Sequence, residues 1–247
     1  MDRSSHFRHE LQGQNEQAGH VSGAHVWGQS PDPSSGDESV RSEHAEVGDY
    51  SGRVIRARGV EKRYGEKRAL RGAGFDLAPG GFLVVTGPNG SGKTTLLRLC
   101  AGLAVPTAGE LEISVERGRI GYLAHESLVY RELTALENLD LYGRLYRVLE
   151  RRERVGMLLE RFGLWDARHE RAGAYSRGML QRLALCRTLL HEPDLLVLDE
   201  PYTGLDDEGA ALLDRELAER RSRSAFLVAT HEPARIERFA SARLALA

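Results

Sequence analysis

Cysteines and long apolar runs are scarce in this sequence. Only Cys100 and Cys186 occur among the 247 residues, and their wide separation excludes a disulfide framework and a CxxC metal site. Both lie in apolar helical contexts, which predicts buried, reduced thiols. No apolar run approaches the roughly 18 to 20 residues that cross a bilayer, and no secretory leader pattern opens the chain. We therefore expect any membrane role to act through a partner protein.

Excess charge of one sign is also lacking. The formal net charge is -2 and the pI is about 6.5, so no global basic field is present and no nucleic-acid partner is expected. Residues 1–52 are rich in Ser, Gly, Gln, His and acidic residues, which predicts a disordered polar tail. Its histidines are irregularly spaced, so a solvated tail is favoured over a metal or haem role. The folded domain is then residues 53–247.

Alternating and continuous apolar segments of this domain predict an α/β fold. Residues 54–58 and 75–77 are typical of strands and predict a small, mostly antiparallel sheet. Residues 111–115 and 120–123 are also typical of strands, and we expect them to extend this small sheet and the core sheet. Continuous apolar runs at residues 82–85, 195–198 and 225–229 are typical of parallel strands covered on both faces. The expected architecture is a mainly parallel sheet flanked by helices.

Residues of about 125–190 are predicted to form a helical subdomain. Apolar residues recur at helical spacing between positions 145 and 162, which predicts one continuous amphipathic helix. The residues of this pattern are Leu145, Val148, Leu149, Val155, Leu159 and Phe162. Arg151, Arg152 and Arg154 are expected on or near its solvent side. Glutamates are interleaved with these arginines, which favours a solvated helix face over a nucleic-acid surface.

The segment Gly87–Thr94, with the sequence GPNGSGKT, matches the phosphate-loop pattern GxxxxGK[ST] and lies between a predicted strand and a predicted helix. Glycines let the backbone N–H groups turn toward a phosphate, Lys93 reaches the terminal phosphates, and Thr94 offers its hydroxyl to Mg²⁺. The N-terminal end of the following helix adds positive potential. The residues predicted to bind nucleotide here are Gly87, Asn89, Gly90, Ser91, Gly92, Lys93, Thr94 and Thr95. A glycine-rich turn is the alternative, which the strand–loop–helix order disfavours.

Polar residues follow the two other buried strands. Asp199 and Glu200 come directly after residues 195–198, and His231 follows residues 225–229. Ligands of doubly wound sheets collect beyond the carboxyl ends of the strands, so these side chains are expected to converge on the phosphate loop. Asp199 is predicted to hold Mg²⁺ opposite Thr94, and Glu200 to polarise the attacking water. ATP and Mg²⁺ are therefore the expected ligands.

With these motifs, the sequence from about residue 54 to its end resembles the nucleotide-binding subunits of ATP-binding cassette (ABC) transporters, P-loop NTPases. Residues 175–182, YSRGMLQR, resemble the family signature LSGGQ, and residues 199–206 resemble a Walker B segment running into a D-loop that ends at Asp206. Tyr64 matches the aromatic residue that stacks on adenine, with an ordinary strand aromatic as the alternative. His231 matches the switch histidine.

The resemblance implies a head-to-tail dimer of two such subunits, identical or different. Ser176 and the N–H of Gly178 would contact the γ-phosphate of ATP held by the other subunit. Lys93, Glu200 and His231 would form the catalytic group, and Asp206 would be among the residues that bind the nucleotide. An integral membrane permease is the implied partner, and the cytoplasmic face of the inner membrane is the implied location. Arg177 and Met179 depart from the family signature.

The sequence departs from the family at one further position. Most members have a glutamine there that contacts Mg²⁺, and this sequence has His125. A neutral imidazole can bind a metal or accept from water, so His125 is a candidate Mg²⁺ contact, with an exposed loop histidine as the alternative. The sequence looks most similar to the haem-exporter ATPases of cytochrome c biogenesis at His125, residues 132–139 and the YSRGM segment. Haem is accordingly a candidate cargo, carried by the permease.

Other classes of function make different predictions. The ATPase of a drug, lipid or polysaccharide exporter would share most of these motifs. A soluble ABC ATPase acting on DNA or ribosomes predicts a second cassette, a coiled-coil insertion or a strongly basic surface, and the sequence contains none of them. A regulatory module that binds nucleotide without hydrolysis would not need a water-orienting carboxylate at position 200.

Overall fold

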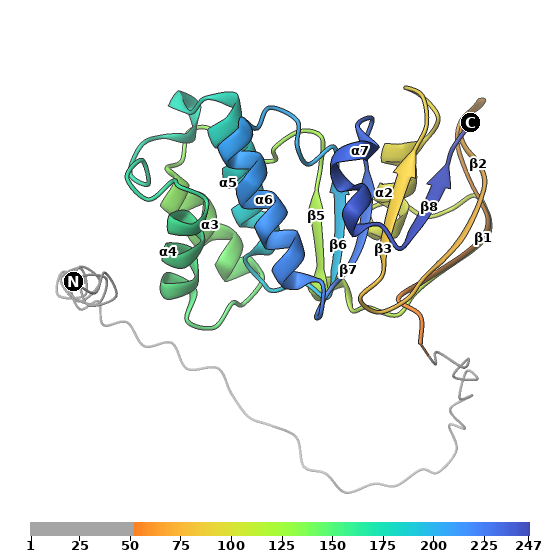
Figure 1. Ribbon diagram of the computed structural model, residues 1–247, viewed down its shortest axis with the longest axis horizontal. Coiled ribbons are helices and arrows are strands. Elements are labelled where there is room, and N and C mark those ends of the chain that lie inside the picture. The colour runs from red at the N-terminus through yellow and green to blue at the C-terminus, as the bar shows by residue number, and fades with distance from the viewer. Residues whose placement is uncertain (1–51) are drawn as a thin grey trace, which may run out of the picture. The chain divides into compact units, whose positions relative to one another are not determined.

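A parallel sheet of five strands, in the order β5-β6-β7-β3-β8, carries the fold of the protein (Figure 1). The computed structural model describes residues 52–247, so the predicted tail lies outside the described residues except for Gly52. All four neighbouring strand pairs are parallel. The strands are β3 (Phe82–Thr86), β5 (Ile120–Leu123), β6 (Leu195–Asp199), β7 (Ala225–Ala229) and β8 (Ala242–Ala245).

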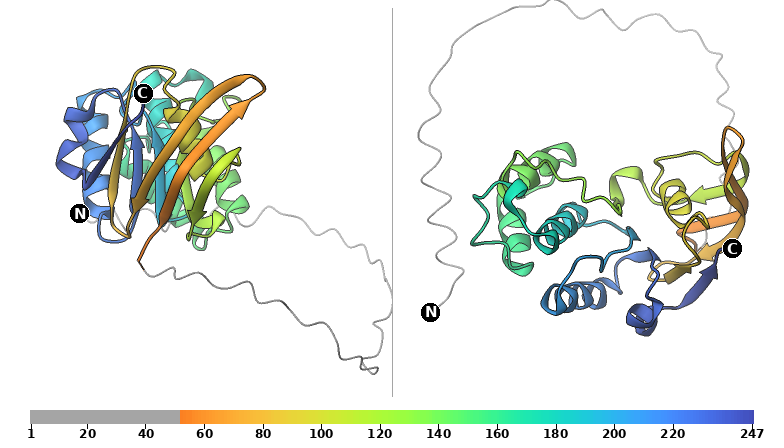
Figure 2. Two further views of the ribbon diagram at one scale, coloured as in Figure 1. Left: turned by 90° about the vertical axis from the view of Figure 1, so that its right-hand side faces the viewer. Right: turned by 90° about the horizontal axis from the view of Figure 1, so that it is seen from above.

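A smaller antiparallel sheet has the order β2-β1-β4, and it lies beside the parallel sheet in Figures 1 and 2. Its strands are β1 (Ile55–Tyr64), β2 (Lys67–Leu77) and β4 (Ala108–Ile113). The first two form a hairpin in which Tyr64 pairs with Lys67, while β4 pairs with the other edge of β1. The two sheets confirm the α/β architecture predicted from the sequence.

Helices cover both faces of the parallel sheet. Helix α2 (Lys93–Cys100) follows β3 and lies between the two sheets, whereas α3, α4, α5 and α6 gather on the opposite side (Figure 1). The bounds of the remaining helices are α3 (Ala135–Leu145), α4 (Arg151–Arg161), α5 (Arg177–Leu189), α6 (Asp207–Arg220) and α7 (Pro233–Ile236). Short 3₁₀ turns span Arg117–Arg119, Ala172–Ala174 and Glu237–Phe239.

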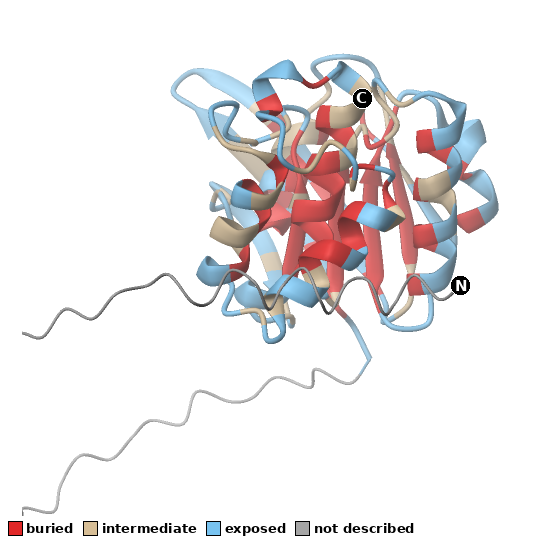
Figure 3. Cartoon of the chain, turned by 90° about the vertical axis from the view of Figure 1, so that its left-hand side faces the viewer, coloured by how far each residue is buried: buried red, intermediate tan, exposed pale blue. Residues whose placement is uncertain are grey.

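Each buried strand supplies two hydrophobic cores, because successive side chains point to opposite faces. In β3, Phe82 and Val84 pack with the core on the side of α3 to α6, and Leu83 and Val85 pack with α2 and the antiparallel sheet. Figure 3 shows the central strands buried along their length and outer helices with exposed outward faces, whereas residues 183–189 of α5 are buried throughout. This double coverage explains why β3, β6 and β7 are continuous apolar runs.

The prediction of one helix through residues 145–162 is wrong. Helix α3 ends at Leu145 and α4 begins only at Arg151, and both Leu145 (68% exposed) and Leu149 (88% exposed) face solvent. The chain folds back on itself between the two helices, where Arg147 and Glu150 have positive φ. Arg151 thereby reaches back to α3. The apolar residues at positions 145–162 belong to two separate helices and the turn between them, and their helical spacing across the turn is a coincidence.

The arginines of α4 are less exposed than predicted. Arg151 donates from Nε to Asp140 of α3 over 2.5 Å, and its side chain is only 28% exposed. Arg154, 14% exposed, donates to the carbonyl of Leu189 over 3.1 Å and pairs with the carboxylate of Glu192, just after α5. Of the three, Arg152 alone is fully on the solvent side. Arg151 and Arg154 therefore hold α4 against its neighbours.

Both cysteines are free and buried, as predicted. Burial raises the pKa of the Cys100 thiol to about 12 and that of the Cys186 thiol further, so neither is a ready nucleophile. Within residues 52–247, the helices are all too short or too polar to cross a membrane. Strand β8 was not predicted, because its short sequence carries no strong strand signal and its place is set by pairing with β3.

Candidate nucleotide site

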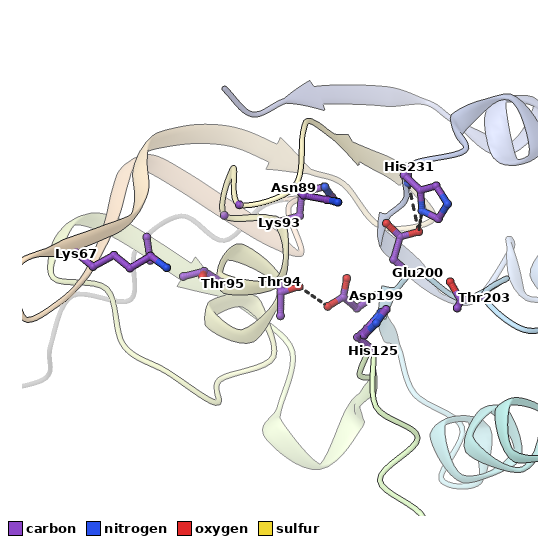
Figure 4. A pocket seen from close by; sticks show the side chains of 13 residues that line it. Lys67, Asn89, Lys93, Thr94, Thr95, His125, Asp199, Glu200, Thr203 and His231 are labelled. Carbon is purple, nitrogen blue, oxygen red and sulfur yellow. Dashed lines mark hydrogen bonds and ion pairs between the residues drawn. The ribbon is translucent and has the colours of Figure 1, made fainter. Parts of the chain in front are cut away.

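A pocket of about 580 Å³ opens where β3, β6 and β7 end, at the carboxyl edge of the parallel sheet (Figure 4). Its lining includes most of the residues that the sequence singled out: Asn89, Gly90, Gly92, Lys93, Thr94, Thr95, His125, Asp199, Glu200 and His231. It also includes Lys67, Ala69 and Thr203, which were not predicted. The strand ends converge as expected, because parallel strands bring their carboxyl ends to one edge.

The loop between β3 and α2 needs glycine at two positions. Gly87 has a φ of 145° and Gly92 a φ of 100°, a region that favours glycine. A Cβ at Gly92 would lie 2.4 Å from the carbonyl oxygen of Ala69, and one at Gly87 would lie 2.4 Å from that of Leu246. The close approach of the loop to β2 and to the end of the chain therefore depends on both glycines.

Helix α2 begins at Lys93 without a side-chain cap, whereas α3, α5 and α6 are capped by Thr134, Ser176 and Asp206. The first N–H groups of a helix have no partner within it, so the uncapped end of α2 has donors available for an anion. Its first turn contains no acidic residue that would compete for them. The start of α2 therefore offers the kind of donors that a phosphate group requires.

Within residues 52–247, two polar groups of this loop have no anionic partner. The ammonium of Lys93, 9% exposed, donates to the carbonyls of Gly87 over 2.7 Å and Pro88 over 3.2 Å. The hydroxyl of Ser91 is buried and has no hydrogen-bond partner within residues 52–247. A buried hydroxyl without a partner is costly, and phosphate oxygens would satisfy both groups.

Thr94 and Asp199 join the helix start to the end of β6. The hydroxyl of Thr94 donates to Oδ2 of Asp199 over 2.7 Å, and the carboxylate is only 2% exposed. Burial raises the pKa of Asp199, the hydrogen bond from Thr94 opposes that rise, and the charge of Glu200 adds to it. A divalent cation is the partner that such a buried carboxylate lacks.

The donor set fits Mg²⁺. The ion prefers oxygen ligands at about 2.1 Å in an octahedron, where adjacent ligands lie about 3 Å apart, close to the separation of Thr94 Oγ1 and Asp199 Oδ2. Within the described part of the chain, no cluster of three or more His, Cys, Asp or Glu residues could hold a metal ion. Phosphate oxygens and water would have to complete the coordination. This arrangement is usual for Mg²⁺ at nucleotide sites.

Glu200 and His231 form the other side of the pocket. Oε2 of Glu200 lies 2.8 Å from Nδ1 of His231 and also accepts the backbone N–H of His231 over 3.2 Å. Because an ionised carboxylate only accepts, Nδ1 carries the proton in this pair. Glu200 has a φ of 51°, and its own N–H donates to the carbonyl of Ala229 over 2.9 Å. A strained backbone held by the neighbouring strand is typical of functional sites.

His125 is exposed and lines the pocket close to Asp199 (Figure 4). Its charge, when protonated, would favour the ionised form of that carboxylate. The geometry is therefore compatible with a contact to a metal-bound water. The loop that follows is held by α3, because the hydroxyl of Tyr142 donates to the carbonyl of Leu128 over 2.9 Å.

Six of the predicted site residues do not line this pocket: Gly87 and Ser91, which belong to the phosphate loop itself, and Tyr64, Ser176, Gly178 and Asp206, which lie outside that loop. Ser176 caps α5, accepting the N–H of Met179 over 3.2 Å, and Gly178 lies in the first turn of that helix. A Cβ at Gly178 would lie 2.9 Å from the carbonyl of Gly204, so the signature segment packs against the loop after β6. Asp206 caps α6 by accepting from Gly209 over 2.8 Å.

Tyr64, another of these six residues, lies at the edge of the site. Its ring is 51% exposed at the end of β1, and the ammonium of Lys62 lies 5.0 Å from the ring centroid. Its hairpin partner Lys67 lines the pocket. Sequence reasoning missed Lys67 and Ala69 because it placed only the end of β2 on a strand. Lys67 and Ala69 are two positions apart in β2, so their side chains point to the same face of the sheet.

Comparisons with known families agree with this geometry. The family model described as ABC transporter matches residues 70–203, more than half of the chain. Daunorubicin resistance ATP-binding protein DrrA3 of Streptomyces coeruleorubidus is 44% identical over 169 residues, which cover 64% of this chain and 54% of that protein. Nod factor export ATP-binding protein I of Paraburkholderia xenovorans is 36% identical over 184 residues, which cover 70% and 60%. The chain thus spans little more than half the length of these relatives.

A solved structure gives the same result. The dimeric post-hydrolysis state of an ATP-binding cassette bound to ADP and Pi aligns with a TM-score of 0.68 at 28% identity, and covers 78% of this chain and 94% of that one. The similarity confirms the fold class predicted from the sequence.

Proposed function

The chain belongs to the ABC transporter family, and from this premise we propose that it binds and hydrolyses ATP as the motor subunit of an exporter. The observation that carries the proposal is the convergence of Lys93, Thr94, Asp199, Glu200 and His231 on one pocket. A phosphate cradle, a metal-binding carboxylate and a candidate water-orienting carboxylate together match the requirements of phosphoryl transfer to water.

Each residue then has a distinct task. The N–H groups at the start of α2 and the ammonium of Lys93 bind the phosphates and stabilise charge that develops on them. Thr94 and Asp199 would hold Mg²⁺, which neutralises charge on the terminal phosphates when bound. Glu200 orients the attacking water and accepts its proton, while His231 keeps that carboxylate in position through Nδ1. Catalysis is therefore mostly positioning and charge stabilisation.

A dimer is part of the proposal. Ser176, Gly178 and Asp206 do not line the pocket of their own chain, so they can meet a nucleotide only across a contact with a second cassette. The start of α5 is the N-terminal end of a 13-residue helix, which favours a γ-phosphate there. The similar cassette described above was solved as a dimer. We infer a head-to-tail pair, of identical or related subunits, closed by ATP.

The cargo and the membrane partner follow by analogy with the relatives. Their names concern daunorubicin resistance and Nod factor export, which favours the export of an organic molecule through a separate permease. The subunit would then sit on the cytoplasmic face of the membrane. Haem export is supported only by the resemblance of His125, residues 132–139 and the YSRGM segment, and the two relatives named above lend it no support.

Two measurements test this function. Purified protein should hydrolyse ATP in the presence of Mg²⁺, and Lys93→Ala should abolish this activity chiefly by weakening nucleotide binding. Arg68→Ala, a change on the exposed antiparallel sheet, provides the matched control and should leave hydrolysis intact. Copurification with a multi-span membrane protein would support the export role, and hydrolysis that persists in Lys93→Ala would refute the assignment of the site.

A further inference from the structure

Lys67 is a cation in the pocket for which the known motifs give no role. It opens β2, outside the phosphate loop and outside every segment that the sequence analysis singled out. Its side chain lines the pocket together with Lys93 and Thr95. In Figure 4 it extends toward Thr95, at the opposite end of the site from Glu200 and His231. Building on the proposed function, we propose that Lys67 binds the α-phosphate of the nucleotide.

The position in the pocket selects the α-phosphate. Glu200 and His231 mark the end where the γ-phosphate would be attacked, and Lys93 lies between the two ends. A triphosphate that starts at Glu200 and passes Lys93 ends beside Thr95 in the first turn of α2. The ammonium of Lys67 extends toward this end, so it meets the phosphate attached to the nucleoside.

The local charge also leaves Lys67 available. Within residues 52–247, Lys67 forms no ion pair, whereas its neighbour Arg68 pairs with Glu61 over 2.7 Å. Successive side chains of a strand point to opposite faces, so the two cations face different surroundings. An unpaired ammonium beside a loop of phosphate-binding amides is an additional anion contact.

The hairpin supports a nucleoside at this end. Tyr64 pairs with Lys67 in register, and its ring is half exposed. Lys62 covers one face of that ring while donating to the carbonyl of Val105 over 2.8 Å. The opposite face is left for a base. One hairpin therefore offers an aromatic surface and a cation next to each other, which are the groups that a base and its first phosphate require.

The test is equilibrium binding of ATP, ADP, AMP and adenosine to the full chain. If Lys67 contacts the α-phosphate, Lys67→Met weakens the binding of ATP, ADP and AMP by the same factor, about five- to tenfold, and leaves adenosine binding unchanged. Lys67→Arg should restore most of the affinity. Arg68→Met removes the neighbouring positive charge and serves as the matched control, with no change in affinity.

Three outcomes would overturn the proposal. Unchanged affinity in Lys67→Met would exclude a contact, a loss confined to ATP would move the contact to the γ-phosphate, and an equal loss for adenosine would indicate a change in folding or in the base site. If the wild-type protein bound neither ATP nor ADP, the proposed function itself would fail. If the wild type binds both and Lys67→Met binds equally well, only this inference fails.

Discussion

His191 should make the stability of this protein depend on pH below neutrality. The imidazole is 9% exposed and stacks on Tyr146 with ring centroids 4.0 Å apart. Its Nε2 lies 3.2 Å from the carbonyl of Ile120, and its Nδ1 is buried with no partner within the described residues. Burial lowers the pKa of His191 to about 4, while the bond to Ile120 opposes that shift. The folded protein therefore keeps this ring neutral.

The sign and size of the effect follow from this shift. The unfolded chain binds a proton at the ordinary pKa of 6.5 and the folded chain only near 4, so the unfolded state takes up more protons between these values. The free energy of unfolding should fall as pH drops from 6.5 toward 4, by about 2 to 3 kcal/mol at pH 4.5. Above pH 6.5 this contribution should be constant.

Urea unfolding of the wild type and of His191→Phe measures the effect. Phenylalanine keeps an aromatic ring beside Tyr146 and cannot titrate, although losing the bond to Ile120 should cost about 1 kcal/mol at pH 7.5. The wild type should then lose stability relative to the variant as pH falls, because other titrating groups cancel in the difference. A difference that stays constant between pH 7.5 and 4.5 would refute the reasoning.

Two further substitutions probe the pocket itself. Gly92→Ala should lower the free energy of unfolding by about 2 kcal/mol or more and weaken ATP binding, because the new Cβ would meet the carbonyl of Ala69 at a left-handed φ. Urea unfolding checks it, and a loss under about 0.5 kcal/mol would contradict it. With ATP present, adding Mg²⁺ should raise the melting temperature of the wild type, and Asp199→Asn should lose most of this further increase. An increase equal to that of the wild type would exclude Asp199 as the carboxylate that holds the metal.

The parts of the site that depend on local sequence could be predicted. The glycine spacing of the phosphate loop and the apolar runs before Asp199 and His231 are local signals, and parallel strands bring their ends together by geometry. Strand β8 depends on pairing with β3, a contact between residues far apart in the chain. No local pattern carries that information.

The errors also have physical causes. The chain turns between α3 and α4 at Arg147 and Glu150, which have positive φ, and Arg151 then contacts Asp140 of α3. A periodicity argument cannot detect this turn because it assumes a continuous helix. Lys67 was missed because its relevance comes from the hairpin that turns β2 toward the loop before α2. Ser176 and Gly178 were predicted from the resemblance alone, and the pocket of one chain does not include them.

The central claim is that Glu200 catalyses the hydrolysis of ATP that is bound between two cassettes. Light scattering and ATP turnover of Glu200→Gln with Mg²⁺ and ATP test it most directly. The account predicts a stable particle of twice the 27.4 kDa chain mass, retaining ATP, with turnover reduced about a hundredfold or more. A protein that stays at the mass of one chain and hydrolyses ATP as fast as the wild type would contradict it.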